Sequence, residues 1–533
     1  MTASLVLPIP GDAQSIPELI RRRAAQLPGS EALVDGEHRF TFADVDRLTA
    51  QWAAAMRQHG LTPGDRVAVS LPNGAPIALS FLAAMRAGLI WVGINRAYVA
   101  TEKSALLADC DARVLLTSRA LLLAHPPDGV QQIDVESALW TTAVAGGAAA
   151  VAEHAAPIAE EPIDPSVAAA IAYTSGTTGV PKGVVHSQRN IMLPGVVAQM
   201  RGDGAGRIGM YLPMTSLNMQ VLGTVYALIN GECLVCIPRS DAASVVAAVR
   251  DESIVRLSAS PATLYDIVRD ATVPRAALAT LSALTLGGGP TNPLLGAAFT
   301  ERFGHRFLSG YGLTEAPASV TREQPGTPAR AGSSGPPLPQ YALDIVDGDG
   351  AQLPAGEIGE VCVRATATGP LAGVYTPMLG YWGRPDATTE AMRGGRLHTG
   401  DFGWLDSFGE LHVADRRVDL IVRGGSNVYP AEVERVLLAD ERVVECAVIG
   451  RADERLGQVP VAFVRSAASA SLAAADVLAV AAASLAPFKV PVDVVFVDEF
   501  PRNQMGKIVR TELRDRLAVR PAPAAVPPDT VGR

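Results

Sequence analysis

The chain contains very little lysine. Of its 45 basic residues only four are lysines, namely Lys103, Lys182, Lys489 and Lys507. Because arginine supplies almost every other cation, a remaining lysine indicates a position that favours a compact ammonium on a flexible stem over a planar guanidinium. Lys182 and Lys507 also stand in segments of unusual composition, which makes them the first candidates for chemistry.

Other absences exclude whole classes of protein. No run of 18 apolar residues occurs, and Arg86 interrupts the nearest approach, Phe81–Ile94, so we expect no transmembrane segment. Met1–Ser15 lacks the basic and apolar regions of a secretory signal. The net charge of −9 argues against nucleic acid as a partner. Five cysteines, an odd number in a long chain, favour a reducing, cytoplasmic location.

One cysteine pair, Cys233 and Cys236, has the C-x-x-C spacing. It lies in the apolar run Gly231–Pro238, which is typical of a buried strand, where residues three apart point to opposite faces. No second Cys or His pair stands nearby at zinc spacing. We therefore favour packing in the core over a metal or redox role.

Length and patterning predict an α/β protein with more than one domain. A chain of 533 residues with 48% hydrophobic content is too long for a single core. Strand-like and helical runs alternate, which predicts parallel sheets covered by helices. The strand-like runs are Arg66–Leu71, Arg113–Thr117, Val167–Thr174, Cys233–Ile237, Ile254–Ser258 and Leu281–Leu286, and the helical runs are Phe42–His59, Pro76–Ala87, Ala242–Arg250 and Pro293–Phe303.

The pattern changes near Tyr341, where short strands separated by Gly/Asp turns predict a small β-barrel-like subdomain at about 341–414. A compact α+β pattern follows and predicts a smaller C-terminal domain with its own core. The expected divisions are an N-terminal domain 1–416, a C-terminal domain 419–517 and a disordered tail 518–533, rich in Pro and Ala.

The segment Thr174–Gly183 is suited to holding phosphates. It follows an apolar strand and combines hydroxyls, three glycines and Lys182. The glycines allow a tight turn that presents backbone N–H groups, and the hydroxyls donate further hydrogen bonds. It is not a Walker A loop, because Pro181 precedes the lysine and Gly183 follows it. A polar loop without a ligand is the plainer alternative.

A second cluster occupies Leu308–Ala316. Tyr311 stands between two glycines, so no neighbouring side chain prevents its ring from lying on a flat base. Thr314 and Glu315 offer oxygen ligands of the kind that Mg²⁺ prefers. Upstream, the expected strand ends in Gly287–Pro290. Its three glycines have no side chain, so a ligand can approach the backbone closely. Turns at strand ends are the alternative reading of both glycine groups.

A third cluster lies where the two domains join. In His398–Asp401 a carboxylate follows a tight turn, which suits it to ribose hydroxyls. Asp415 and Arg416 come next, and a local ion pair would also explain them. The pair Gly424–Gly425 could form a turn over which a narrow ligand chain passes.

In this order, the segments resemble the adenylate-forming superfamily of acyl- and aryl-CoA synthetases, peptide-synthetase adenylation domains and beetle luciferases. The resemblance extends from about Ser15 to Leu517. Tyr173–Val184 is similar to the family's phosphate loop, Tyr311–Glu315 to its adenine and magnesium motif, Thr399–Asp401 with Arg416 to its ribose-binding pair, Gly424–Glu434 to the start of its mobile domain and Lys507 to its catalytic lysine.

The resemblance implies a two-step reaction. A carboxylate attacks the α-phosphate of ATP to give acyl-AMP and pyrophosphate, and a thiol, usually that of coenzyme A, then displaces AMP. Lys507 would offset the charge that builds as the two anions meet. The C-terminal domain would rotate about a hinge at 417–418 between the two steps. Two positions depart from the family pattern: Ser216 replaces a larger pocket residue, and Val418 stands at the hinge.

The resemblance also implies a full set of site residues. The catalytic group is Lys507, Thr314 and Glu315, with Glu315 and Thr174 as magnesium ligands. The ATP-binding set is Thr174, Ser175, Gly176, Thr177, Thr178, Gly179, Lys182, Gly288, Gly289, Pro290, Ser309, Gly310, Tyr311, Gly312, Asp401 and Arg416. The acyl pocket is Ser216, Asn218, Leu222, Gly288, Leu313, Ala316 and Pro317, the coenzyme A tunnel is Gly424 and Gly425, and the hinge is Val418.

The identities of the carboxylic acid substrate and of the thiol acceptor stay open. Thr215–Gly223 contains no acidic residue that could hold the amino group of an amino-acid substrate, and no carrier-protein serine motif is visible. Both observations favour a free-standing CoA ligase. An acyl-AMP ligase that loads a separate carrier protein is the alternative, and a non-catalytic nucleotide-binding protein is a weaker one. Since the pocket set holds no cation, we expect a hydrophobic monocarboxylate, either medium-chain fatty or aromatic. We expect the enzyme to act as a monomer or homodimer.

Overall fold

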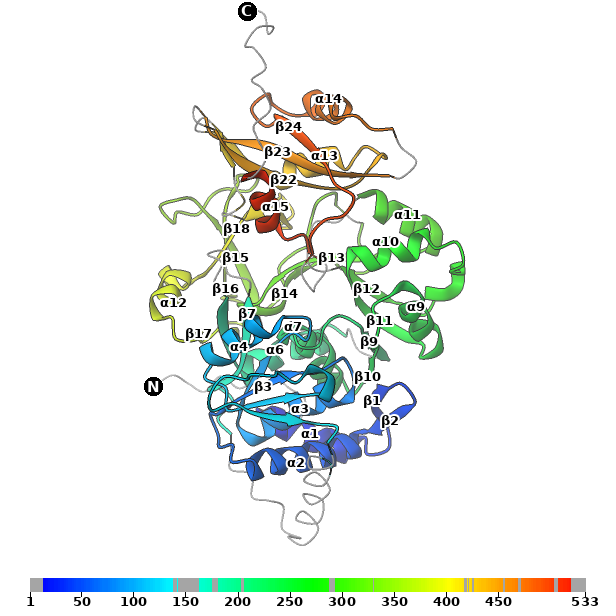
Figure 1. The fold of residues 1–533 in the computed structure, drawn as a ribbon, viewed down its shortest axis with the longest axis vertical. Coiled ribbons are helices and arrows are strands. Elements are labelled where there is room, and N and C mark those ends of the chain that lie inside the picture. Colours follow the sequence, from blue (N-terminus) through cyan, green and yellow to red (C-terminus); the bar gives the residue numbers. More distant parts are fainter. Residues whose placement is uncertain are drawn as a thin grey trace, which may run out of the picture.

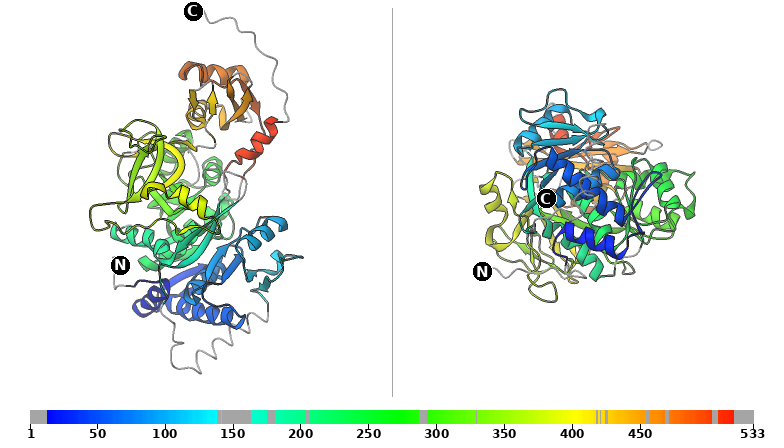
Figure 2. Two further views of the ribbon diagram at one scale, coloured as in Figure 1. Left: turned by 90° about the vertical axis from the view of Figure 1, so that its left-hand side faces the viewer. Right: turned by 90° about the horizontal axis from the view of Figure 1, so that it is seen from below.

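The computed structural model describes most of the chain. The described residues are 13–137, 141, 163–174, 181–202, 206–286, 293–328, 330–416, 419, 421–423, 426–453, 456–467, 471–502 and 507–518. The N-terminal elements lie at one end of the long axis and the C-terminal elements at the other (Figures 1 and 2). The predicted hinge 417–418 and nearly all of the predicted tail, 519–533, lie outside the described residues.

The first sheet carries the predicted phosphate segment near one edge. Its strand order is β17-β8-β7-β4-β3-β5-β6, and the pairs from β7 to β6 are parallel, whereas β8 and β17 pair antiparallel. The strands are β3 (Arg66–Ser70), β4 (Ile90–Gly93), β5 (Val114–Thr117), β6 (Gln131–Asp134), β7 (Ala168–Thr174), β8 (Lys182–Ser187) and β17 (Gly380–Tyr381).

The second sheet has eight strands and ends in the predicted adenine motif. Its order is β14-β13-β12-β11-β9-β10-β1-β2, parallel except for the pairs β13–β14 and β1–β2. The strands are β1 (Glu31–Asp35), β2 (His38–Thr41), β9 (Arg207–Met210), β10 (Cys233–Cys236), β11 (Ile254–Ala259), β12 (Ala283–Leu286), β13 (Leu308–Leu313) and β14 (Ala316–Arg322).

Helices cover these sheets. They are α1 (Ile16–Gln26), α2 (Phe42–Gln58), α3 (Ala75–Ala87), α4 (Ala100–Asp109), α6 (Gln188–Met200), α7 (Leu217–Met219), α8 (Tyr226–Asn230), α9 (Ala242–Asp251), α10 (Pro261–Arg269) and α11 (Pro293–Phe303). The apolar run Phe81–Ile94 forms the end of α3 and all of β4, and Phe81 packs edge-on against Trp91 at 5.3 Å between ring centres. No helix within the described ranges is long and apolar enough to cross a membrane.

The predicted β-rich subdomain is a four-stranded antiparallel sheet. It consists of β15 (Tyr341–Val346), β16 (Gly359–Ala365), β18 (Leu397–Leu405) and β19 (Leu411–Arg416), in that spatial order. The short helix α12 (Pro385–Ala391) precedes β18. One hydrophobic core joins this sheet to the two larger ones.

The C-terminal elements form a separate α+β unit with hydrophobic clusters of its own. Its strands are β20 (Ile421–Arg423), β21 (Ser426–Val428), β22 (Val443–Asp453), β23 (Gly457–Ser466) and β24 (Asp493–Phe496), and its helices are α13 (Pro430–Leu437), α14 (Ala474–Ser484) and α15 (Arg510–Ala518). The predicted fold class, parallel sheets under helices followed by a smaller α+β domain, is therefore confirmed.

The C-x-x-C pair packs in the core. Cys233 and Cys236 both lie on β10, buried and without a disulfide. The Cys236 thiol lies 3.8 Å from the Met214 sulfur. Burial raises the pKa of Cys233 to about 11, so its thiol stays protonated and unreactive near neutral pH.

Candidate active site

The predicted phosphate segment is the connection of a β-hairpin. Thr174 at the end of β7 pairs with Lys182 at the start of β8, and the Thr174 hydroxyl donates to the Lys182 carbonyl at 3.4 Å. The hairpin thus fixes both ends of the connection. The predicted ATP-binding residues within it, Ser175–Gly179, lie outside the described residues, as do Gly288–Pro290 after β12.

A chain of contacts links this hairpin to the predicted magnesium ligand. The Lys182 ammonium lies 5.0 Å from the centre of the Tyr381 ring, and the Tyr381 hydroxyl donates to Glu315 Oε1 at 2.8 Å. Burial, together with the Glu315 carboxylate, raises the pKa of Tyr381, so the phenol stays protonated and remains a donor. Sequence reasoning missed Tyr381 because it comes from β17, far along the chain.

The hairpin β13–β14 carries the predicted adenine and magnesium motif. Gly312 is required there, since a Cβ atom would meet the Ala318 carbonyl oxygen at 2.1 Å. The Thr314 carbonyl at the turn accepts a hydrogen bond from His186 Nε2 at 2.7 Å. Burial lowers the pKa of His186 to about 4, so the ring is neutral and its proton sits on the donating nitrogen. His186 is a second residue that the sequence did not reveal.

Tyr311 and Asp401 meet across the site. The Tyr311 hydroxyl donates to Asp401 Oδ2 at 2.6 Å, and the Asp401 backbone N–H donates to the Thr399 hydroxyl at 3.1 Å. Asp401 is 4% exposed. The predicted adenine-binding and ribose-binding residues are thus neighbours, although 90 positions separate them in the chain.

The expected tight turn before Asp401 is wrong. His398–Asp401 lies inside the nine-residue strand β18, and only Gly400 departs from the strand, with a φ of +72°. Asp401 pairs with Arg416 across β18 and β19. A local irregularity in a strand, rather than a turn between strands, therefore presents the carboxylate.

The predicted acyl-pocket residues of the 208–229 segment share one property. Nearly every residue of this segment is buried, and the four that are partly exposed are Pro213, Ser216, Asn218 and Leu222. The last three are the predicted pocket residues. Ser216 directly precedes α7, Asn218 lies on α7, and Leu222 lies on the π-helical turn Gln220–Val225. The turn contacts β14, and α7 contacts β7 and β14. Solvent thus reaches these three side chains within an otherwise closed interior.

The Asn218 side chain has a fixed orientation. Its Oδ1 accepts a hydrogen bond from the backbone N–H of Ala318 at 3.3 Å. Ala318 has a φ of +69°, a conformation that non-glycine residues rarely adopt. Because the backbone group can only donate, the amide oxygen must face it. Of the other predicted pocket residues, Leu313, Ala316 and Pro317 are buried.

Lys507 extends from the C-terminal domain. It is exposed, and the next residue, Ile508, forms a bridge with Arg502. Across the two domains, the Arg465 guanidinium lies 5.8 Å from the centre of the Tyr265 ring on α10. Lys489, another of the four lysines, donates to both carboxylate oxygens of Glu432 at 2.7 Å. The predicted tunnel residues Gly424 and Gly425 lie outside the described residues.

Comparison with known proteins decides the family. Residues 20–382 match the family described as AMP-binding enzyme, and residues 432–507 match the AMP-binding enzyme C-terminal domain. The chain belongs to this family. It is a member of the adenylate-forming superfamily, on the branch of AMP-forming acid–thiol ligases, and the resemblance predicted from the sequence is confirmed.

Similar proteins cover almost the whole of this AMP-binding enzyme. A feruloyl-CoA synthase of an Amycolatopsis species is 33% identical over 93% of this chain and 98% of its own length. A fatty acid–[acyl-carrier-protein] ligase of Streptomyces coeruleorubidus is 30% identical over 95% of this chain and 96% of its own length. The structure of o-succinylbenzoate CoA synthetase from Bacillus subtilis, in complex with its acyl-adenylate intermediate, superposes with a TM-score of 0.80 at 28% identity, covering 93% of this chain and 98% of that one.

Proposed function

We propose that this AMP-binding enzyme converts a hydrophobic monocarboxylic acid, ATP and coenzyme A into acyl-CoA, AMP and pyrophosphate. An oxygen of the carboxylate attacks the α-phosphate and pyrophosphate leaves. The sulfur of coenzyme A then attacks the acyl carbonyl, and AMP leaves. The proposal rests above all on the partly exposed wall Ser216, Asn218 and Leu222, which lies between the strand that precedes the phosphate segment and the strand that follows Glu315.

The residue roles combine the family resemblance with the contacts that the described residues make. Lys507 balances the charge of the two anions in the first step, and it is an exposed group of the C-terminal domain beside the bridged residue Ile508. Tyr311 and Asp401 hold the nucleoside, and Lys182 lies near the phosphates, since it follows the phosphate segment directly.

Magnesium fits the side chains that surround Glu315. Its Oε1 accepts the Tyr381 hydroxyl, whereas no hydrogen bond to Oε2 occurs among the described residues, so one oxygen remains for a cation. Thr174 would supply the second oxygen. When bound, the ion would neutralise phosphate charge. Tyr381 itself orients the Glu315 carboxylate.

The pocket wall specifies the acid further. Ser216, Asn218 and Leu222 carry no charge, so a second carboxylate of the substrate would be desolvated without a partner. Asn218 directs its oxygen to Ala318, so its NH₂ group points away from the Ala318 N–H, and the residue is partly exposed. We therefore propose that the preferred acid carries a hydrogen-bond acceptor, such as an ether or carbonyl oxygen, where it passes Asn218.

A carrier protein is a second candidate for the thiol. The Streptomyces coeruleorubidus relative is named as a fatty acid–[acyl-carrier-protein] ligase, and it matches this chain over nearly its full length. In that case acyl-AMP would form in the same way, and the phosphopantetheine thiol of a separate carrier would replace that of coenzyme A.

The test is pyrophosphate release with a panel of acids, with and without coenzyme A. The panel pairs each benzoate or medium-chain acid with an analogue that carries an ether or carbonyl oxygen. The proposal predicts acid-dependent release, acyl-CoA as the product and a preference for the acceptor-bearing member of each pair. Efficient turnover of malonate or succinate would contradict it, and acyl-AMP that accumulates in the presence of coenzyme A would favour the carrier.

The variant Asn218→Asp sharpens this test. It keeps the side-chain oxygen that accepts the Ala318 N–H but replaces the NH₂ donor with a second oxygen, which is an acceptor. Acceptor-bearing acids should lose about tenfold in kcat/KM, whereas their unsubstituted partners should change much less. A uniform loss across the panel would show that Asn218 supports the fold and does not select the acid.

A further inference from the structure

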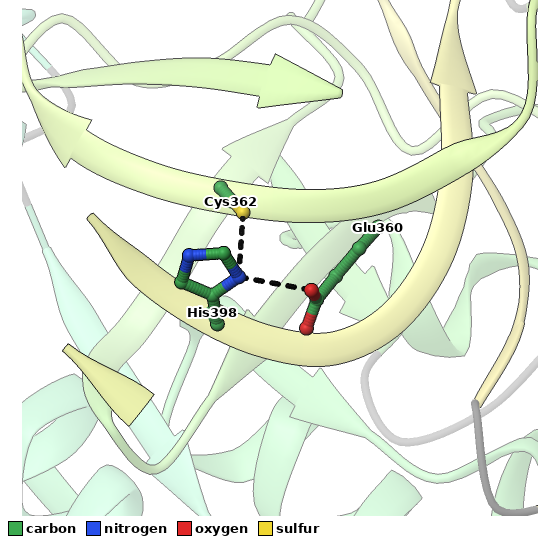
Figure 3. A group of neighbouring side chains, drawn as sticks. All are labelled: Glu360, Cys362 and His398. Atoms are coloured by element: carbon green, nitrogen blue, oxygen red, sulfur yellow. Dashed lines mark hydrogen bonds and ion pairs between the residues drawn. The ribbon is translucent and has the colours of Figure 1, made fainter. Parts of the chain in front are cut away.

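Three polar side chains meet on the sheet next to Asp401. Glu360 and Cys362 lie on β16, and His398 lies on the facing strand β18 (Figure 3). His398 Nδ1 is 2.9 Å from Glu360 Oε2 and 3.3 Å from the Cys362 sulfur. All three are nearly enclosed, since Cys362 is fully buried and the side chains of Glu360 and His398 are about 10% exposed.

The arrangement resembles a metal site but lacks its chemistry. A single atom, His398 Nδ1, faces both Glu360 and Cys362, and the Glu360 oxygen that it contacts also accepts Arg393 at 3.0 Å. Burial raises the pKa of Cys362 to about 12, so the thiol is protonated as it lies in this cluster. An arginine already neutralises the carboxylate. The cluster is therefore better explained as a hydrogen-bonded brace than as a cation site.

The second oxygen of Glu360 reaches the irregular part of β18. Oε1 accepts the backbone N–H of Gly400 at 3.2 Å, at the residue whose φ of +72° breaks the strand. The next residue is Asp401. Glu360 therefore holds the strand at two points, the His398 ring and the Gly400 N–H, and both lie within three positions of the carboxylate that contacts Tyr311.

Thr399 also helps to fix the backbone next to Asp401. The Thr399 hydroxyl donates to the Val361 carbonyl at 2.7 Å and accepts the Asp401 N–H at 3.1 Å. Strand β16 thus forms a separate hydrogen bond to each of the residues 398, 399 and 400. The register between β16 and β18 shifts between the pairs Cys362–His398 and Glu360–Phe402, so residues 399–401 have no regular partner on β16 and side chains of β16 fix them from this edge. On the other edge, Asp401 pairs with Arg416 of β19.

We propose that Glu360 is a positioning residue for Asp401. Its carboxylate fixes the backbone at Gly400 so that Asp401 faces Tyr311 and can bind the ribose hydroxyls of ATP. The inference rests on the ribose-binding role of Asp401 in the proposed function. Glu360 touches neither substrate nor cofactor, so its loss should weaken nucleotide binding through Asp401 alone.

The experiment compares the affinity for ATP with that for 2′,3′-dideoxy-ATP by calorimetry, in the wild type and in Glu360→Ala. The wild type should bind ATP more tightly, because only ATP offers hydroxyls to Asp401. In Glu360→Ala, ATP affinity should fall about tenfold while dideoxy-ATP affinity stays unchanged. Glu360→Gln, which keeps an oxygen for Gly400 N–H, should recover most of the preference for ATP.

Asp344→Asn is the matched control. Asp344 is also a buried acid on the same sheet, paired with Arg364 at 2.9 Å and Arg396 at 3.2 Å. Within the described part of the chain its carboxylate forms no hydrogen bond or ion pair with residues 398–401. It should lower the melting temperature without changing the preference for ATP. If both nucleotides weaken equally in Glu360→Ala, or if stoichiometric zinc copurifies with the wild type, the inference is overturned. If the wild type itself does not distinguish the two nucleotides, the ribose role of Asp401 fails instead.

Discussion

The Tyr311 hydroxyl and the Asp401 carboxylate lie 2.6 Å apart. One comes from β13 of a parallel sheet and the other from β18 of an antiparallel sheet, so the contact joins two parts of the large domain (Figure 1). In the proposed function Tyr311 lies against the adenine base and Asp401 binds the ribose hydroxyls. Their hydrogen bond therefore sets the spacing between the base-binding and ribose-binding groups.

Tyr311→Phe tests this spacing. The variant keeps the ring that stacks on the base and removes only the hydroxyl, so Asp401 loses a donor in a nearly buried position. A hydrogen bond to a charged group contributes about 1.5–3 kcal/mol, so the KM for ATP should rise at least tenfold while the KM for the acid stays unchanged. Tyr265→Phe removes a phenol outside the site and should leave both constants as they are. A rise in both KM values for Tyr311→Phe would contradict the assignment.

His186 makes the stability of the protein depend on pH. Burial lowers its pKa from 6.5 to about 4, so the unfolded chain binds a proton more readily than the folded one between these values. This contribution to stability is fully present above pH 6.5 and is lost as the pH falls towards 4, by about 3 kcal/mol. His186→Gln retains a donor for the Thr314 carbonyl and removes the titration.

The measurement is the free energy of unfolding between pH 4.5 and 7.5 for the wild type and His186→Gln. The wild type should lose stability more steeply below pH 6.5, and the two curves should run parallel above it. His38→Gln makes the same substitution at an exposed histidine and is the matched control. Parallel curves over the whole range would show that His186 is not held neutral.

The contact between the domains should affect one half-reaction only. Asp266 on α10 faces Arg465 and Arg502 of the C-terminal domain, and their attraction opposes the rise in its pKa that burial causes. Arg502 is also only five positions from Lys507. Asp266→Lys would repel both arginines, so acyl-AMP formation should slow by up to about fivefold, while thioester formation from supplied acyl-AMP is retained.

Asp251→Lys, the same charge change on the exposed end of α9, is the control for this variant. It should alter neither half-reaction. Equal slowing of both half-reactions in Asp266→Lys would indicate a general folding defect. An unchanged rate of acyl-AMP formation would show that this arrangement of the domains is not the one in which Lys507 acts.

The sequence predicted the fold through its alternating runs. Phe42–His59 becomes α2 and Val167–Thr174 becomes β7 almost residue for residue, because the apolar pattern of each element matches its buried face. The resemblance implied Ser216, Asn218 and Leu222 as part of the acyl pocket, and they are three of the four partly exposed residues in the segment 208–229, although their role stays a prediction.

The contacts between distant segments could not be predicted. Tyr381, His186 and Glu360 carry no motif of their own, and each gains its role from a partner that only the folded chain brings near. The strand at His398–Asp401 was mistaken for a turn because glycine usually marks turns, whereas Gly400 marks an irregularity within a strand.

The central claim is that this AMP-binding enzyme forms acyl-AMP with the help of Lys507 and then releases the acyl group to a thiol without it. The decisive measurement is the rate of each half-reaction in Lys507→Ala, namely pyrophosphate release from acid and ATP, and acyl-CoA formation from synthetic acyl-AMP. The first should fall at least about a hundredfold, because a charge aimed at the transition state is lost, and the second should be nearly unchanged. Lys507→Arg should fail in the same way, since the bulkier guanidinium cannot replace a compact ammonium. Equal loss of both half-reactions, or full retention of the first, would contradict the account.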